Sequence, residues 1–165
     1  MEAIALDAVQ VPLYRRDGSV AGYTLVSAAD AEFVSQWRWR IGPYGYAMRA
    51  FRVDGRLSSV FLHRELLGLK KGDGLEVDHI NRARLDNRRE NLRAIPKGVN
   101  QQNRPSYRGS SSRFRGVSWH VGKKMWSARV KVEGKRLNLG YFASEEDAAD
   151  VARIVRLRRL PYAVD

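Results

Sequence analysis

Asp78 and His79 stand next to each other in the middle of the sequence, and two asparagines, Asn91 and Asn100, follow downstream. Hydrolysis of a phosphodiester bond needs a base that deprotonates water, a cation that neutralises the transition state, and oxygen atoms that hold this cation. An imidazole can be the base, and carboxylate and amide oxygens are suitable ligands for a hard divalent cation. These four positions therefore predict a site that hydrolyses phosphodiesters with one metal ion.

The same residue types also occur without any catalytic role. A histidine beside an aspartate is more often a surface hydrogen-bonding pair than a catalyst. The asparagines that follow the pair favour the catalytic interpretation in this sequence. Asn81 and Asn87 are instead expected to form turns, because short amides tolerate left-handed backbone and bond to their own chain.

A short strand is expected to carry the acidic residue and the histidine. Branched residues predict this strand over residues 75–80. Adjacent side chains at the end of a strand point to opposite faces, so Asp78 and His79 can serve the metal and the water separately. A polar loop is expected over 81–87, and a helical or turn-rich return over 88–94.

The segment before this strand reads as short strands and turns around helices. A turn signal between two apolar runs predicts a hairpin from about 11 to 25. Ser27 and Asp30 resemble a capping box that opens a helix over 28–36, and apolar spacing predicts another helix over 60–67. Core packing is the expected role of the aromatic residues between these helices: Trp37, Trp39, Tyr44, Tyr46 and Phe51.

The C-terminal third alternates between apolar and cationic residues. Trp126, Ala128, Val130 and Val132 fall on one side of a predicted strand, and Ser127, Arg129 and Lys131 fall on the other. A turn at Glu133–Gly134 leads into a strand over 135–142, and Ser144 is expected to cap the helix that follows. The pattern predicts a sheet with one apolar face, covered by this helix, and one free cationic face.

Length and charge indicate two small units and a polyanionic partner. The chain has 165 residues, 44% hydrophobic content and a net charge of +12. The first 62 residues are nearly neutral, whereas ten basic residues face one acidic residue between positions 104 and 136. Nucleic acid is the first candidate partner, because neutralised phosphates release counterions, and an anionic membrane surface is the second.

The absence of cysteine limits the ligands that a metal ion could have. It excludes disulfides and thiolate zinc sites, so a metal must be held by carboxylate, imidazole or amide groups. Such ligands favour magnesium, for which manganese can substitute. The sequence has no run of about 18 apolar residues and no signal-peptide pattern, so we expect an intracellular, cytoplasmic protein without a membrane partner.

The sequence around the aspartate–histidine pair resembles the HNH endonuclease family. The similar stretches are VDHIN at 77–81 and LDNRRENLR at 85–93, within a resemblance that covers roughly residues 63–103. In this family an Asp/Glu-His pair, a central Asn and a terminal His or Asn build a ββα-metal site. The resemblance implies these roles: His79 as general base, Asp78 and Asn100 as metal ligands, and Asn91 as the support of the histidine loop.

Two positions in this resemblance have alternative assignments. Many relatives have histidine as the last metal ligand, whereas this sequence offers Asn100, or Asn103 in its place. His63 belongs to the family pattern and is expected to pack or to touch phosphate without binding metal.

The C-terminal pattern resembles the DNA-binding domain of plant ethylene-response factors, a unit also fused to phage HNH nucleases. The resemblance spans about residues 114–157 and includes RFRGV at 113–117 and LGYF at 139–142. It implies DNA contacts at Arg115, Ser118, His120, Arg129, Lys131, Arg136 and Asn138. Ser118, His120 and Asn138 depart from the plant residues, so binding mode transfers better than the recognised sequence.

The sequence thus predicts an α+β protein with an HNH, ββα-metal nuclease core and a C-terminal three-stranded antiparallel sheet packed on one helix. The expected parts are 1–103 with the nuclease core at 60–103, a linker at 104–113, and a DNA-binding domain at 114–165. The predicted function is magnesium-dependent cleavage of double-stranded DNA by a homing or mobile-element enzyme, phage-encoded or bacterial.

Two rival functions stay open at this point. A DNA-binding regulator with a non-cleaving HNH fold is the first alternative. An RNA-binding protein is disfavoured, because the sheet lacks aromatic triplets that stack unpaired bases. Cutting of one strand or both depends on whether the protein is a monomer or a homodimer.

Overall fold

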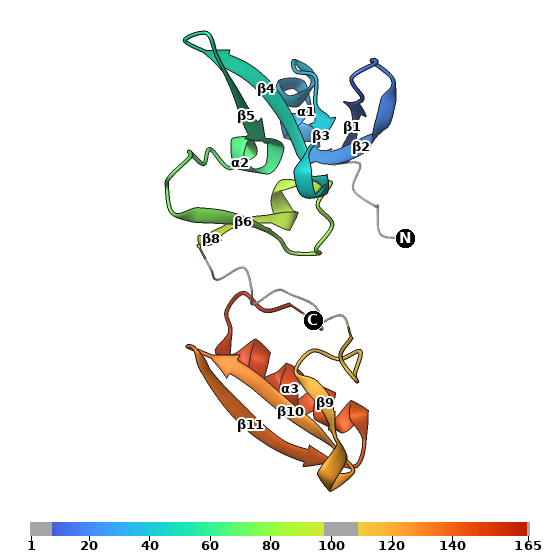
Figure 1. The fold of residues 1–165 in the computed structure, drawn as a ribbon. Coiled ribbons are helices and arrows are strands. Elements are labelled where there is room, and N and C mark those ends of the chain that lie inside the picture. Colours follow the sequence, from blue (N-terminus) through green and yellow to red (C-terminus); the bar gives the residue numbers. More distant parts are fainter. Residues whose placement is uncertain (1–7, 98–108, 165) are drawn as a thin grey trace, which may run out of the picture. The chain divides into compact units, whose positions relative to one another are not determined.

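The computed structural model describes residues 8–97 and 109–164. The chain forms two compact units, Met1–Gly98 and Val99–Asp165. Both contain strands and helices, so the predicted mixed α+β class is confirmed (Figure 1). Asn100, Asn103 and half of the expected linker, residues 104–108, lie outside the described residues, as do residues 98–103, which would complete the expected ββα motif.

The first unit is built from several small sheets. Its elements are β1 (Ala8–Tyr14), β2 (Val20–Ser27), α1 (Ala28–Ser35), β3 (Arg40–Ile41), η1 (Pro43–Gly45), β4 (Ala47–Val53), β5 (Arg56–Phe61), α2 (Leu62–Leu66), β6 (Leu75–His79), β7 (Asp86–Asn87), η2 (Arg89–Asn91) and β8 (Leu92–Pro96). The predicted hairpin is confirmed, since β1 and β2 pair in antiparallel register. The short strand β7 then joins β2 in parallel and brings the chain after β6 back to this hairpin.

The helix α1 begins after Ser27 as predicted, but the predicted capping box does not form. The Ser27 side chain makes no cap hydrogen bond, and its Oγ accepts from the backbone N–H of Arg89 at 2.9 Å. The Asp30 carboxylate accepts from Nε and Nη2 of Arg89, at 2.8 and 2.7 Å. A forked guanidinium binds a carboxylate more strongly than a backbone N–H does, so these side chains tie α1 to η2.

The helix α2 is shorter than the predicted helix over 60–67. Val60 belongs to β5, where it pairs with Arg49 of β4. This cross-strand hydrogen bonding extends the hairpin by two residues at the expense of the helix. The chain turns away at Gly68, which has a φ of +66° that favours glycine.

One hydrophobic core holds the first unit together. Fully or nearly fully buried side chains from its hairpins and helices meet there: Val11, Leu13, Val26, Val34, Trp39, Ala47, Leu62, Leu66, Val77 and Leu92. Trp39 is completely buried and donates from Nε1 to the carbonyl of Val34 at 2.8 Å. Trp37 and Tyr44 are exposed, so core packing was predicted correctly for only part of the aromatic group.

The second unit is a sheet with a helix on one face (Figure 1). Its elements are β9 (Val117–His120), η4 (Val121–Lys123), β10 (Met125–Val132), β11 (Lys135–Phe142) and α3 (Glu145–Arg159). The sheet is antiparallel with strand order β11-β10-β9. Ala128 and Val130 of β10 form a core with Ala148 and Ala152 of α3. Ser144 caps α3 as predicted, because its Oγ accepts from the N–H of Asp147.

Candidate active site and nucleic-acid surface

Asp78 and His79 end strand β6, and both are almost completely buried, at 4% and 5% exposure. The antiparallel pairing of β6 with β8 places Asp78 opposite Arg93. The Arg93 guanidinium donates from Nε and Nη2 to the Asp78 Oδ2 atom, at 2.8 and 2.5 Å. Sheet register therefore fixes a cation against this carboxylate.

His79 turns to a different set of partners. Its Nε2 atom lies 3.3 Å from the Oδ1 atom of Asn87, and the Nδ2 atom of Asn87 donates to Thr24 Oγ1 at 2.8 Å. Thr24 in turn donates to the carbonyl of Leu85 at 2.8 Å. Because the Asn87 amide oxygen accepts, Nε2 carries the imidazole proton and the lone pair lies on Nδ1.

The expectation for Asn87 as a turn former is wrong. Asn87 lies in β7, which pairs with β2, and its side chain is completely buried. The strand pairing removes the amide from solvent, so the amide must bond within the protein. Asn81 does form a turn, since its Oδ1 accepts from the N–H of Ala83 at 2.8 Å.

Burial is the main influence on the charge state of His79. It lowers the pKa of His79 below its ordinary value, and Arg84 acts in the same direction. The hydrogen bond to Asn87 and the negative charges of Asp78 and Asp86 oppose this shift without reversing it. The imidazole is therefore neutral at neutral pH, which is the form that can accept a proton.

Asn91 spans the loop that follows His79. Its Oδ1 accepts from the N–H of Asn81 at 2.9 Å, and its Nδ2 donates to the carbonyl of Asp86 at 2.7 Å. Its own carbonyl accepts from the N–H of Ile80 at 2.9 Å. These three bonds join the two ends of the loop, so one buried residue sets the path of the backbone after the histidine.

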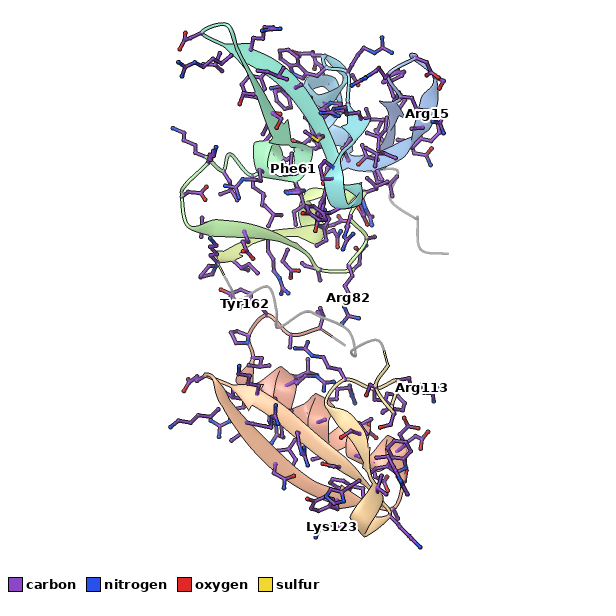
Figure 2. The ribbon with its side chains drawn as sticks, viewed as in Figure 1. Arg15, Phe61, Arg82, Arg113, Lys123 and Tyr162 are labelled. Carbon is purple, nitrogen blue, oxygen red and sulfur yellow. The ribbon has the colours of Figure 1, made fainter. Side chains whose placement is uncertain are left out.

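Two aromatic rings, those of His63 and Tyr46, contact the ring of His79, and Phe61 contacts both of them. The ring of His63 meets the ring of His79 edge-on, with centroids 5.3 Å apart, and stacks on Phe61 at 5.4 Å. Phe61 lies at the end of β5, where the chain enters α2 (Figure 2). The ring of Tyr46 lies 5.6 Å from that of His79. Burial, together with the charges of His79 and Arg64, lowers the pKa of His63 to about 3.

The residues available for a metal ion are few. Within 8–97 and 109–164, no three His, Cys, Asp or Glu side chains gather in a way that could hold one. Asp78 supplies a buried carboxylate, which suits a hard divalent cation, and amide or carbonyl oxygens could add further ligands. This donor chemistry fits a one-carboxylate site of the kind predicted with Asn100.

The residues predicted to contact DNA mostly share one surface, the outer face of the β9–β11 sheet. Register pairs Arg129 with Asn138, and Lys131 with Arg136. Paired residues in an antiparallel sheet project to the same side, which here is opposite the face that packs on α3. The pairing of β9 with β10 places Ser118 and His120 on this same side. The seventh residue, Arg115, precedes β9, and its carbonyl accepts from Arg156.

The turn at one end of this face is also basic. Lys123, between β9 and β10, holds its ammonium 4.4 Å from the ring centroid of Tyr141 (Figure 2). His120 accepts from the N–H of Lys123 through Nδ1 at 3.1 Å. This bond ties one of the predicted contact residues to the turn.

Three residues around Asp78 and His79 were not assigned to the site from the sequence. Arg93 could have been found from its place opposite Asp78 in a hairpin. Thr24 carried no signal and Tyr46 was expected only to pack in the core, because both reach His79 through contacts between distant parts of the chain.

Comparison with known proteins gives the site its context. Residues 60–102 match the HNH endonuclease family. Protein 3.8 of Escherichia phage T7 is 37% identical over 87 residues, which cover 52% of this chain and 69% of the phage protein. No solved structure shows significant similarity. Among the described helices, none is long and apolar enough to cross a membrane. The chain therefore belongs to the same family as phage T7 Protein 3.8 and carries an HNH endonuclease domain at residues 60–102.

Proposed function

We propose that the protein is a metal-dependent DNA endonuclease of the homing or mobile-element type. The supporting observation is the separation of two adjacent buried side chains at the end of β6. Asp78 is bound by Arg93, whereas His79 is bound by Asn87. A carboxylate for a cation and an imidazole for a water molecule are thus held next to each other, each by a different partner.

In this mechanism His79 is the general base. Its Nδ1 takes a proton from the attacking water, and the bond from Nε2 to Asn87 orients the ring. Asp78 and Asn100 would hold the divalent cation, magnesium with manganese as a substitute, which when bound neutralises charge on the phosphate and the leaving oxygen. Asn91 keeps the histidine loop in place, and Asn103 is the alternative ligand to Asn100.

The second unit would bring double-stranded DNA to the nuclease. Its cationic face resembles that of the ethylene-response-factor domain and has a width that suits a major groove. Arg129, Lys131 and Arg136 would contact phosphates and base edges. Since the relative is a phage protein, we place this activity inside a bacterial cell.

A non-cleaving DNA-binding regulator is the second candidate, and the Arg93 contact favours it. Arg93 bonds twice to Oδ2 of Asp78, the carboxylate that would also have to bind the metal ion. A guanidinium that stays there in the DNA complex would compete with a cation for this oxygen.

Replacement of single histidines distinguishes the nuclease from the non-cleaving regulator. We expect His79→Ala to slow single-turnover, magnesium-dependent cleavage of duplex DNA by about 100- to 10,000-fold, with unchanged affinity for DNA. The control is His120→Ala on the sheet, which should change affinity and keep the cleavage rate at saturating protein. Undiminished cleavage by His79→Ala would refute the assigned base. A wild-type protein that binds DNA and never cuts it would establish the regulator.

A further inference from the structure

A pocket rich in arginine lies in the first unit, outside both the HNH match and the C-terminal sheet. It has a volume of about 550 Å³, and its lining includes Arg15, Arg16, Arg38 and Arg40 together with Tyr14 and Trp39. No aspartate or glutamate lines it. The surrounding segment is nearly neutral in sequence, so this concentration of positive charge arises from the fold.

Strand pairing brings the two arginine pairs together. The end of β1 runs parallel to the segment before β3, with Leu13 bridged to Trp39 and the N–H of Tyr14 donating to the Trp39 carbonyl at 2.8 Å. Side chains alternate in extended backbone, so the burial of Trp39 turns its neighbours Arg38 and Arg40 outward. Arg15 and Arg16 directly follow β1, in the turn of the hairpin (Figure 2).

Local contacts hold part of this cluster in a defined shape. The Arg38 guanidinium lies 4.4 Å from the ring centroid of Tyr14, and Arg15 donates from Nη1 to the Val20 carbonyl at 2.8 Å. Within the part of the chain that the structure describes, none of the four arginines forms an ion pair. The carboxylate of Asp17, in the same turn, accepts from the N–H and Oγ of Ser19 at 2.9 and 2.7 Å.

We propose that this arginine pocket binds backbone phosphates of duplex DNA, as an anchor separate from the C-terminal sheet. The guanidinium fork matches the oxygens of a phosphodiester, and like charges held together repel one another until an anion lies among them. The identity of the anion as DNA rests on the proposed function. Contact with the backbone makes this anchor independent of base sequence.

The test uses the full chain with two exposed arginines replaced. Arg16→Gln combined with Arg40→Gln removes two charges and, among residues 8–97 and 109–164, no side-chain hydrogen bond that holds the fold. We expect the magnitude of the negative slope of log affinity against log salt for duplex DNA to decrease by about two, because each lost phosphate contact reduces it by roughly 0.9. The control, Arg52→Gln with Arg56→Gln on the β4–β5 hairpin, makes the same charge change and should keep the wild-type slope.

Two further variants keep the result interpretable. Arg16→Lys with Arg40→Lys retains the charge and should retain the slope. If the double glutamine variant melts early, Arg40→Gln alone serves, with an expected loss of about one from the slope. A pocket variant with the wild-type slope, or equal losses in pocket and control variants, overturns the proposal.

Cleavage distinguishes this proposal from the nuclease proposal. The arginines of the pocket lie outside the assigned catalytic residues, so the rate at saturating protein should be unchanged. A loss of slope in a protein that never cuts DNA would support the anchor and refute the nuclease. Normal cleavage with an unchanged slope would refute the anchor alone.

Discussion

The end of β6 and the outer face of the β9–β11 sheet both carry polar residues, but these residues are buried at the end of β6 and more exposed on the sheet. Asp78 and His79 at the end of β6, and Asn87 of β7 beside them, are buried and bonded to specific partners. On the sheet, Lys131 and Arg136 are exposed. Catalysis needs groups held in one geometry away from water, whereas attraction of a polyanion needs only charge at the surface.

This contrast has an energetic consequence. When a buried polar group loses its partner, the free energy of unfolding decreases, because water cannot replace the lost bond. An exposed cation that is removed costs little stability, and its loss appears in DNA affinity. Substitutions at the end of β6 should therefore change stability and cleavage rate, whereas substitutions on the sheet should change DNA affinity.

The largest expected effect comes from deletion of the chain after Ser112. This deletion removes the cationic sheet and keeps Asp78, His79, Asn91 and Asn100. We expect affinity for duplex DNA to fall on the order of 1,000-fold at about 0.1 M salt, with a flatter salt dependence and some remaining metal-dependent cleavage. Titration of labelled DNA at several salt concentrations measures this change, and unchanged binding would remove the sheet as the anchor.

The next effect concerns acid stability and arises from His63. Its pKa in the folded protein is about 3, below the ordinary 6.5, so only the unfolded chain takes up the proton as the pH falls below 6.5. This loss of stability should reach about 3 kcal/mol at pH 4, and His63→Phe should abolish it. Urea unfolding at pH 7 and pH 4 gives the comparison.

The matched control for acid stability is His120→Phe in the sheet. We expect this variant to lose as much stability as wild type between the two pH values. Equal acid sensitivity of His63→Phe and wild type would show that His63 is protonated in the folded protein.

A smaller effect is expected for the amide that orients His79. Asn87→Ala leaves buried polar atoms of His79 and Thr24 without this partner, so it should lower the free energy of unfolding by about 2 kcal/mol. The exposed Asn138→Ala should change it by less than about 0.5 kcal/mol. Chemical denaturation of both variants checks the difference, and equal losses would contradict the contrast between buried and exposed amides.

The smallest effect on stability is expected on the sheet itself. Lys131→Gln with Arg136→Gln should leave the free energy of unfolding within about 0.5 kcal/mol and reduce the magnitude of the salt slope of DNA binding by about two. Arg153→Gln with Arg158→Gln, on the exposed side of α3, makes the same charge change and should keep the slope. A slope that depends only on net charge would give the same result for both pairs.

Local patterns accounted for the predictions that the structure confirms. The β1–β2 hairpin and the start of α3 follow from turn residues, alternation and a cap, which act over a few neighbouring residues. The capping box of α1 failed because Asp30 bonds to Arg89, 59 residues away. Asn87 was misjudged for the same reason, since its partner Thr24 lies 63 residues away.

Residue type, order and local spacing were enough to identify which side chains could do chemistry and where the net positive charge lies. The fold was needed to show that Asn87 binds His79, that Arg93 binds Asp78, and that four arginines of a nearly neutral segment share one pocket. These arrangements depend on which strands pair and in which register. Pairing between distant strands is a property of the whole fold and leaves no local pattern.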